Sequence, residues 1–119
     1  MEVYINSAGI FLPNNPISND EMEVYLGKVN GKESTLRARI LKQNGIKNRY
    51  YALNKNHEST HSNAELAVNA IEAAIAKSEL RSKEISLLCT GTTQGDLPIP
   101  GFASMVHAGL DFNKCELAS

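Results

Sequence analysis

Residues 84–95 read Glu-Ile-Ser-Leu-Leu-Cys-Thr-Gly-Thr-Thr-Gln-Gly, an apolar run that passes directly into a turn rich in glycine and threonine. The nearly continuous apolar side chains of this run predict a strand that is covered on both faces, as in a parallel sheet. A proline-punctuated loop follows at residues 96–100, and the apolar spacing of residues 101–110 predicts a helix. We expect a second buried strand to begin at residue 115.

The preceding residues predict further strands and helices. Alternating apolar side chains predict a strand at residues 3–12, and two capping boxes, Ser18 with Glu21 and Ser62 with Glu65, predict helix starts. The helix after Ser62 is rich in alanine and apolar on most sides, so we expect it to be buried between layers. A basic helix at residues 34–44, ended by Asn-Gly, completes an α/β layer fold with a mixed sheet.

Composition and charge exclude several function classes. The 119 residues carry 12 Lys and Arg against 13 Asp and Glu, for a net charge of −1, without a basic block. Nucleic acid is therefore not an expected partner. No apolar stretch approaches the ~18 residues of a membrane span, and the N-terminus lacks the pattern of a signal peptide. We expect a cytoplasmic protein that does not bind membranes.

Two kinds of residue could indicate a metal or a nucleophile. Residues 57–61, His-Glu-Ser-Thr-His, fit the H-E-x-x-H motif, which on a helix presents two imidazoles to zinc. Their polar neighbours favour a solvated loop at 54–61, so we expect neither a metal site nor a cofactor. Cys89 and Cys115 lie in or beside apolar runs, which favours buried thiols over a disulfide or a nucleophile.

The remaining polar cluster is Thr92, Thr93 and Gln94, at the edge where open α/β sheets bind ligands. A polar turn that hydrogen-bonds its own backbone explains the same residues, and the sequence leaves both interpretations open. The sequence lacks G-x-G-x-x-G, P-loop and G-x-S-x-G motifs, the common signals for dinucleotides, nucleoside triphosphates and serine hydrolases.

Several blocks of the chain together carry a family resemblance. They are Ala-Gly-Ile-Phe-Leu-Pro at 8–13, Asn-Gly-Ile-Lys-Asn-Arg at 44–49, the alanine-rich helix, Gly-Thr-Thr at 91–93, and Pro-Gly-Phe-Ala-Ser-Met-Val-His at 100–107. With these blocks the chain resembles the N-terminal part of a ketoacyl-ACP synthase III-like condensing enzyme of the thiolase fold. The resemblance spans nearly the whole chain, and its last two blocks are the most specific.

The resemblance implies an acyltransferase of fatty-acid or polyketide-like biosynthesis. Such enzymes move an acyl group from a thioester to a cysteine, then join it to a carbanion made by decarboxylating a malonyl-type extender. The positions of that cysteine, and of the histidine and asparagine that act in decarboxylation, come after Ser119. We therefore expect no catalytic residue in this chain, and we expect residues 1–119 to be an incomplete portion that continues beyond Ser119.

The same resemblance implies roles for two side chains and for several partners. Thr93 would line the acyl cavity, and Ile99 would cross the interface of a homodimer into the partner's cavity.

The substrates would be thioesters of acyl-carrier protein or of coenzyme A, and the protein partner would be the remainder of the enzyme or a second chain. Arg39 stands where coenzyme A-primed members carry tryptophan, and Gln43 where arginine is usual, so adenine stacking is lost. The alternative function is a non-catalytic dimerisation or pocket-shaping partner of a condensing enzyme.

Overall fold

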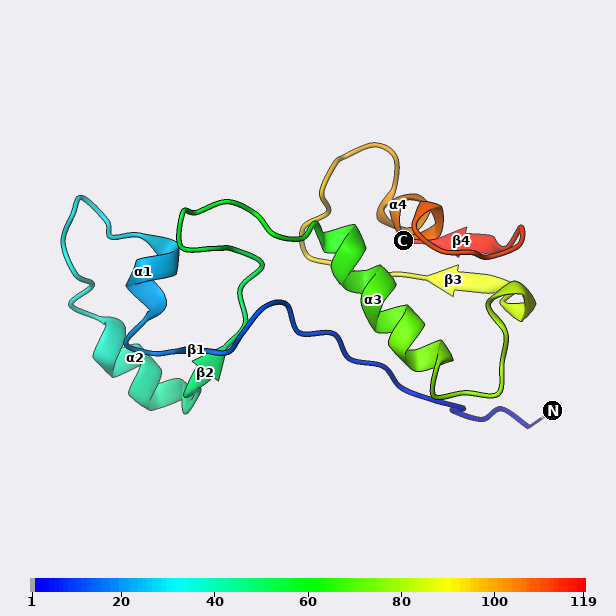
Figure 1. Cartoon of the computed structure of the whole chain (residues 1–119), viewed down its shortest axis with the longest axis horizontal. Coiled ribbons are helices and arrows are strands. Elements are labelled where there is room, and N and C mark those ends of the chain that lie inside the picture. Colours follow the sequence, from blue (N-terminus) through cyan, green and yellow to red (C-terminus); the bar gives the residue numbers. More distant parts are fainter. Residues whose placement is uncertain (1) are drawn as a thin grey trace. The chain divides into compact units, whose positions relative to one another are not determined.

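The structure is a computed structural model that describes residues 2–119. The chain divides into two compact units (Figure 1). Unit 1 combines the N-terminal residues up to Phe11 with Ser62–Ser119, and unit 2 is Leu12–His61. Within the described residues, no helix is long and apolar enough to cross a membrane.

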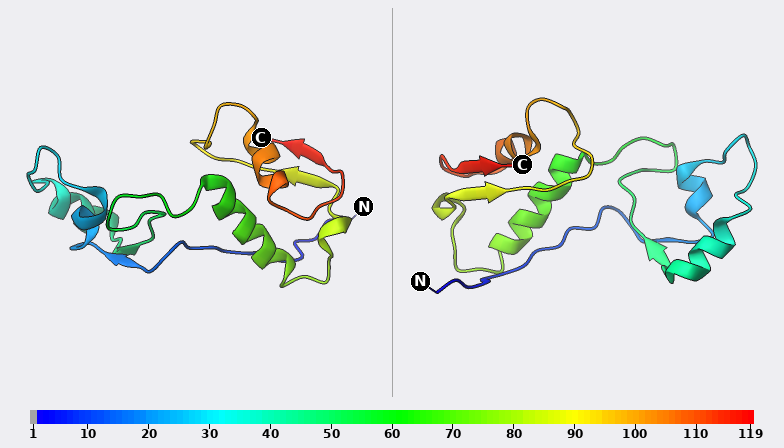
Figure 2. Two further views of the ribbon diagram at one scale, coloured as in Figure 1. Left: turned by 45° about the horizontal axis from the view of Figure 1, so that its top comes forward. Right: turned by 180° about the vertical axis from the view of Figure 1, so that it is seen from behind.

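Unit 1 is built on a parallel pair of strands. In chain order its elements are α3 (Asn63–Ile75), the 3-10 helix η1 (Ser82–Glu84), β3 (Leu87–Cys89), α4 (Phe102–Ala108) and β4 (Glu116–Ala118). β3 and β4 lie side by side in both views of Figure 2, with Leu88 opposite Leu117. α4 packs against α3 and against both strands, and its Ala103 and Val106 are buried together with Leu88. The strands and the helix predicted from residues 84–118 are therefore confirmed.

Among the residues that the structure describes, only one face of β3 is covered. Because side chains alternate across a strand, Leu88 points to the helices while Leu87 and Cys89 point the other way. Leu87 and Cys89 are exposed, so the prediction of a strand covered on both faces is wrong for the described residues. The apolar run 85–89 predicts a strand, but it does not show whether other helices or strands cover both faces of that strand.

The N-terminal segment does not form the strand predicted at residues 3–12. It runs extended beside α3, where the Ser7 hydroxyl donates a hydrogen bond of 2.8 Å to the carbonyl of Ala74. A strand exists only where a neighbouring strand takes its backbone groups, and among the described residues none pairs with this segment. Gly9 permits the close approach, since an added Cβ would lie 2.1 Å from the Ala70 carbonyl oxygen.

α3 begins at the predicted capping box. The Ser62 hydroxyl accepts from the Glu65 amide at 3.1 Å, and the Glu65 carboxylate accepts from the Ser62 amide at 2.7 Å. The predicted burial of this helix between layers is not observed: most of its residues are half-buried and none is fully buried. α4 and the N-terminal segment contact α3, while the strands of unit 1 pack mainly against α4.

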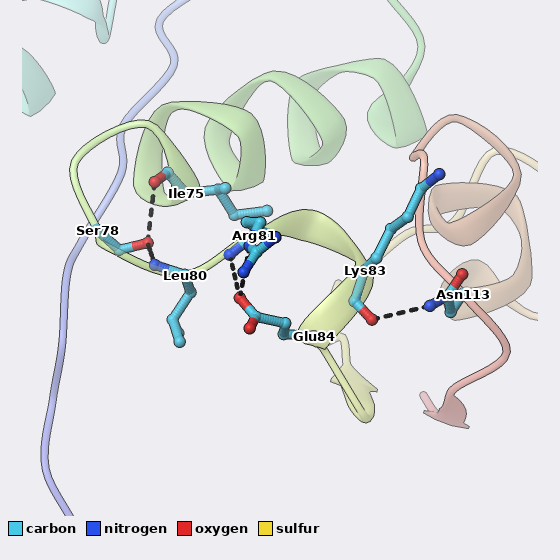
Figure 3. A network of polar contacts seen from close by, with 7 residues as sticks. All are labelled: Ile75, Ser78, Leu80, Arg81, Lys83, Glu84 and Asn113. Carbon is cyan, nitrogen blue, oxygen red and sulfur yellow. Dashed lines mark hydrogen bonds and ion pairs between the residues drawn. The ribbon is translucent and has the colours of Figure 1, made fainter.

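Hydrogen bonds at both ends hold the connection from α3 to β3 (Figure 3). The Ser78 hydroxyl donates to the Ile75 carbonyl at 2.9 Å and so binds an oxygen left over at the end of the helix. The Asn113 side chain donates to the Lys83 carbonyl at 3.0 Å, which ties η1 to the residues just before β4. The bond from Asn113 thus joins the two segments that lead into the parallel strands.

Unit 2 contains a short antiparallel pair and two helices. Its elements are β1 (Ile17–Ser18), α1 (Met22–Leu26), α2 (Arg37–Asn44) and β2 (Asn48–Arg49). α2 ends as predicted at Gly45, whose φ of 68° is left-handed and whose amide donates to Leu41 at 3.2 Å. The α/β class is confirmed, with the antiparallel and parallel pairs in separate two-stranded sheets.

The first predicted capping box, at Ser18, forms only in part. The amide and the hydroxyl of Ser18 both donate to the Glu21 carboxylate, at 3.1 and 2.7 Å. The hydroxyl is thus used as a donor rather than as an acceptor for the helix, and α1 begins only at Met22.

These two bonds predict a pH dependence. The hydrogen bond from the Ser18 side chain, and next the one from its amide, lower the pKa of Glu21 below its ordinary value of 4.5. The contribution of the charged carboxylate to stability is therefore complete above the unfolded pKa and is lost as pH falls through the lower folded pKa. Replacing Ser18 with alanine should raise the Glu21 pKa toward 4.5, which an NMR titration measures. An unchanged Glu21 pKa in that variant would contradict the assignment.

Candidate functional site

The candidate site lies at the carboxyl ends of β3 and β4. The Thr90 amide donates to the Ala118 carbonyl at 2.9 Å and so extends the parallel pairing by one bond. The Ser119 hydroxyl accepts from the amide of Ala103 at 2.9 Å, in the first turn of α4. Two strand ends and a helix start are thus joined at the edge where parallel α/β sheets hold ligands.

A loop of exposed residues, 91–100, connects β3 to α4 beside this edge. The Thr92 hydroxyl donates to the Gln94 carbonyl at 3.0 Å and lies 3.2 Å from the Gln94 amide, which donates back to it. Thr92 therefore closes a turn on its own backbone, the second of the two interpretations left open by the sequence. Thr93 takes no part in these bonds, and its side chain is exposed.

Asp96 anchors the loop to the start of α3. Its carboxylate accepts from the amides of Asn63 and Ala64, at 2.7 and 2.8 Å. The Asn63 side chain donates to the Gln94 carbonyl at 2.8 Å, which adds a second tie. A carboxylate suits this place, because the first amides of a helix lack partners within the helix and carry the positive end of its dipole. Sequence reasoning missed Asp96, since its partners lie more than thirty positions earlier in the chain.

Removing the Asp96 carboxylate is expected to loosen this anchor. In an Asp96→Ala variant, hydrogen exchange at the Asn63 and Ala64 amides should accelerate by about fivefold, the factor that ~1 kcal/mol of lost helix capping corresponds to. The matched control is Asp111→Ala, which removes an exposed carboxylate whose ion pair with Lys83 is 3.8 Å long. Exchange at both α3 amides that matches the unmodified chain would refute the anchor.

The structure brings the two predicted pocket residues, Thr93 and Ile99, onto one loop, without burying either of them. Ile99 is 84% exposed and precedes α4 by three positions. Neither side chain is enclosed by the rest of the described chain. Arg39 and Gln43 lie in unit 2, both exposed on α2, and their spacing of four places them on one face of that helix.

The H-E-x-x-H residues lie in the predicted polar loop and not on a helix. His57 has a left-handed φ of 64°, and its Nε2 lies 3.3 Å from the Val24 carbonyl oxygen. The Nδ1 atom of His61 lies 3.0 Å from the Thr60 hydroxyl. Among residues 2–119, no three His, Cys, Asp or Glu side chains gather as metal ligands would.

Both cysteines are free thiols, and their predicted burial is wrong. Cys89 is exposed and Cys115 is half-buried. Cys89 points to the uncovered face of β3, opposite Leu88, which explains why an apolar neighbourhood in sequence did not make it buried.

The chain is similar in sequence to curated synthase III proteins along most of its length. No family model matches the chain. The chain is 31% identical over 106 residues to a β-ketoacyl-[acyl-carrier-protein] synthase III of Rhodobacter capsulatus, covering 89% of the chain and 29% of that protein. It is 29% identical over 114 residues to the synthase III of Staphylococcus epidermidis, covering 96% of the chain and 33% of that protein. The chain thus spans about a third of the length of the curated relatives it matches.

Solved structures give the same result for the fold. A tetronic acid condensing enzyme superposes with a TM-score of 0.76 at 23% identity, over 95% of this chain and 34% of that one. The 3-oxoacyl-(acyl carrier protein) synthase III of Pseudomonas aeruginosa superposes with a TM-score of 0.64 at 25% identity, over 94% of this chain and 31% of that one. The predicted resemblance to ketoacyl-ACP synthase III enzymes and their thiolase-like α/β fold is confirmed.

Proposed function

We propose that this chain is part of a synthase III-like enzyme that condenses an acyl thioester with a malonyl-type extender, with loss of carbon dioxide. The observation that supports this most is the match to synthase III proteins along 89% and 96% of the chain, at 31% and 29% identity. The groups that carry out the chemistry would lie outside residues 1–119, in the rest of a longer polypeptide or in a second chain.

The proposed reaction has two halves. A cysteine thiolate attacks the acyl thioester and releases the donor thiol, which leaves the acyl group on the enzyme. The extender then loses carbon dioxide, and its carbanion attacks the acyl carbon, so that a carbon–carbon bond forms and the cysteine is released. Splitting the reaction in this way replaces one difficult step with two easier ones.

In this proposal the loop at residues 91–100 forms part of the acyl cavity. Thr93 lines the cavity of its own protomer, and Ile99 reaches the cavity of the partner in a homodimer. The 84% exposure of Ile99 supports the second role, because a large apolar side chain held out on an anchored loop gains free energy when a partner covers it. The anchor through Asp96 limits how far the loop can move.

The proposed donors are thioesters of acyl-carrier protein or of coenzyme A. Arg39 and Gln43 are the residues of α2 that bear on this choice, and neither offers the flat aromatic face on which an adenine stacks. A carrier-protein donor does not need that stacking, whereas a coenzyme A donor would have to bind without it. The first assay should therefore compare both donors.

Intact mass spectrometry of the source material under denaturing conditions tests the proposal first. A parent polypeptide or a second chain that supplies a cysteine at a helix start, with later histidine and asparagine, supports a condensing enzyme. Release of carbon dioxide from a malonyl thioester in the presence of an acyl donor would then be the activity measured. A single species of 13.0 kDa without such activity would refute the proposed condensing activity. The alternative, a non-catalytic partner that shapes the pocket of a condensing enzyme, would then be the better explanation.

A further inference from the structure

The sequence contains two Asn-Gly pairs, at residues 30–31 and 44–45, and the structure gives them different surroundings. Both pairs are exposed, and both lie in unit 2. In such a pair the glycine amide nitrogen can attack the asparagine side chain, because glycine has no side chain to hinder the approach. Which pair reacts then depends on how firmly each reacting group is already held.

The pair at residues 30–31 forms an exposed turn between α1 and α2. Asn30 and Gly31 both have left-handed φ values, 53° and 71°. One backbone hydrogen bond, from the Lys32 amide to the Val29 carbonyl at 3.1 Å, closes the turn, and the bridge between these two residues is isolated. Within residues 2–119, neither the Gly31 amide nor the Asn30 side chain has a hydrogen-bond partner.

The pair at residues 44–45 has both reacting groups occupied. The Gly45 amide donates to the Leu41 carbonyl at 3.2 Å, as part of the end of α2. The Asn44 side-chain oxygen accepts from the Ile46 amide at 2.9 Å. Attack by Gly45 therefore requires the last turn of α2 to open and two hydrogen bonds to break.

We propose that Asn30 is a site of spontaneous deamidation, and that it reacts ahead of Asn44. The deprotonated Gly31 amide nitrogen attacks the side-chain carbonyl carbon of Asn30 and forms a new carbon–nitrogen bond. The bond from that carbon to the side-chain nitrogen breaks, and this nitrogen leaves as ammonia. Water then opens the cyclic imide at either carbonyl, which yields aspartate or isoaspartate at position 30. Hydroxide or a buffer base takes the amide proton, so that no oxidant or cofactor enters the balance.

The product would change both the charge and the shape of this turn. A new carboxylate would join the exposed ion pair of Lys28 and Glu33, which are 3.3 Å apart. Isoaspartate also lengthens the backbone by one carbon, which is incompatible with the register of the bridge from Val29 to Lys32. Val29 lines an apolar groove of about 340 Å³ between α1 and α2, so the change falls at the rim of that groove.

The experiment follows the two sites in one digest of the intact chain. Trypsin gives Val-Asn-Gly-Lys, residues 29–32, and Gln-Asn-Gly-Ile-Lys, residues 43–47, each with a single Asn-Gly pair. The chain is aged at mildly alkaline pH in native buffer and, in parallel, in concentrated guanidinium chloride. Mass spectrometry then counts the gain of one mass unit in each peptide, and an isoaspartyl methyltransferase labels the isoaspartate.

In native buffer, Asn30 should convert at least about tenfold faster than Asn44, because local opening is required only at the second site. In denaturant the two rates should converge, since neither site keeps its hydrogen bonds. In native buffer, an Asn30→Gln variant should lose most of the methyltransferase signal. Equal rates in native buffer, or faster reaction at Asn44 there, would overturn the proposal, and so would methyltransferase labelling that survives in the Asn30→Gln variant aged in native buffer.

Discussion

Replacing Gly9 with alanine is expected to destabilise unit 1 by about 3 kcal/mol, the upper end of the usual cost of overpacking. The added Cβ would lie 2.1 Å from the Ala70 oxygen and 2.4 Å from the Ala74 nitrogen. Both are backbone atoms of α3, so no side chain can rotate away to relieve the contact. The N-terminal segment would have to leave the helix and would lose the bond from Ser7. Urea unfolding measures the change in the free energy of unfolding.

Gly91 provides the matched control for this substitution. A Cβ at Gly91 meets nothing within 4 Å, and its φ lies outside the left-handed region. Gly91→Ala should therefore change the free energy of unfolding by no more than about 0.5 kcal/mol. Hydrogen exchange along α3 adds a local readout, because its amides near Ala74 should exchange faster only in the Gly9 variant. Equal stability of the two variants would show that the segment does not pack on α3 as described.

Replacing Ile99 with glycine in the complete protein is expected to shift its preference toward longer acyl donors. If this side chain closes the far end of the partner's cavity, its removal leaves room for added methylenes, each worth about tenfold or more in kcat/KM. The measurement is the ratio of kcat/KM for a long and a short acyl thioester. An Ile99→Ala variant should shift the ratio in the same direction, which separates lost volume from added backbone freedom.

Leu97 lies on the same loop and serves as the control. Leu97 is 57% exposed and is two residues from Ile99, but the proposal gives it no role in the cavity. Leu97→Gly should leave the ratio unchanged while loosening the loop to a similar degree. An Ile99→Gly enzyme with the chain-length profile of the parent would contradict the proposed role of Ile99, although condensing activity itself could still be present.

Several elements follow from local sequence because their causes are local. The capping box of Ser62 and Glu65 starts α3, since both partners lie within one turn. Gly45 ends α2 because a left-handed residue is required there and glycine adopts it without strain. The apolar run before Thr90 forms β3 for the same kind of reason, since a short apolar run bounded by a turn favours a strand.

Other predictions failed where the answer depends on distant parts of the chain. Apolar and polar side chains alternate along residues 3–12 as in a strand, yet a strand forms only beside another strand. In the described residues this segment lies beside α3 and pairs with no strand. The burial predicted for α3 and Cys89 assumed covering layers, which no local pattern reveals. The anchor at Asp96 joins residues far apart in sequence, so its chemistry shows only when the loop and the helix are folded together.

The sequence by itself determined the α/β class, the start of α3, the end of α2 and the resemblance to synthase III enzymes, because these depend on local hydrogen bonds and on patterns of residue types. The tertiary structure alone decided that Asp96 holds the loop of Thr93 and Ile99, and that Gly9 lies against α3. It also gave the two Asn-Gly pairs, which are identical in sequence, different hydrogen bonds at Asn30 and at Asn44. The physical reason is that hydrogen-bond partners and close contacts between distant segments exist only after the chain has folded.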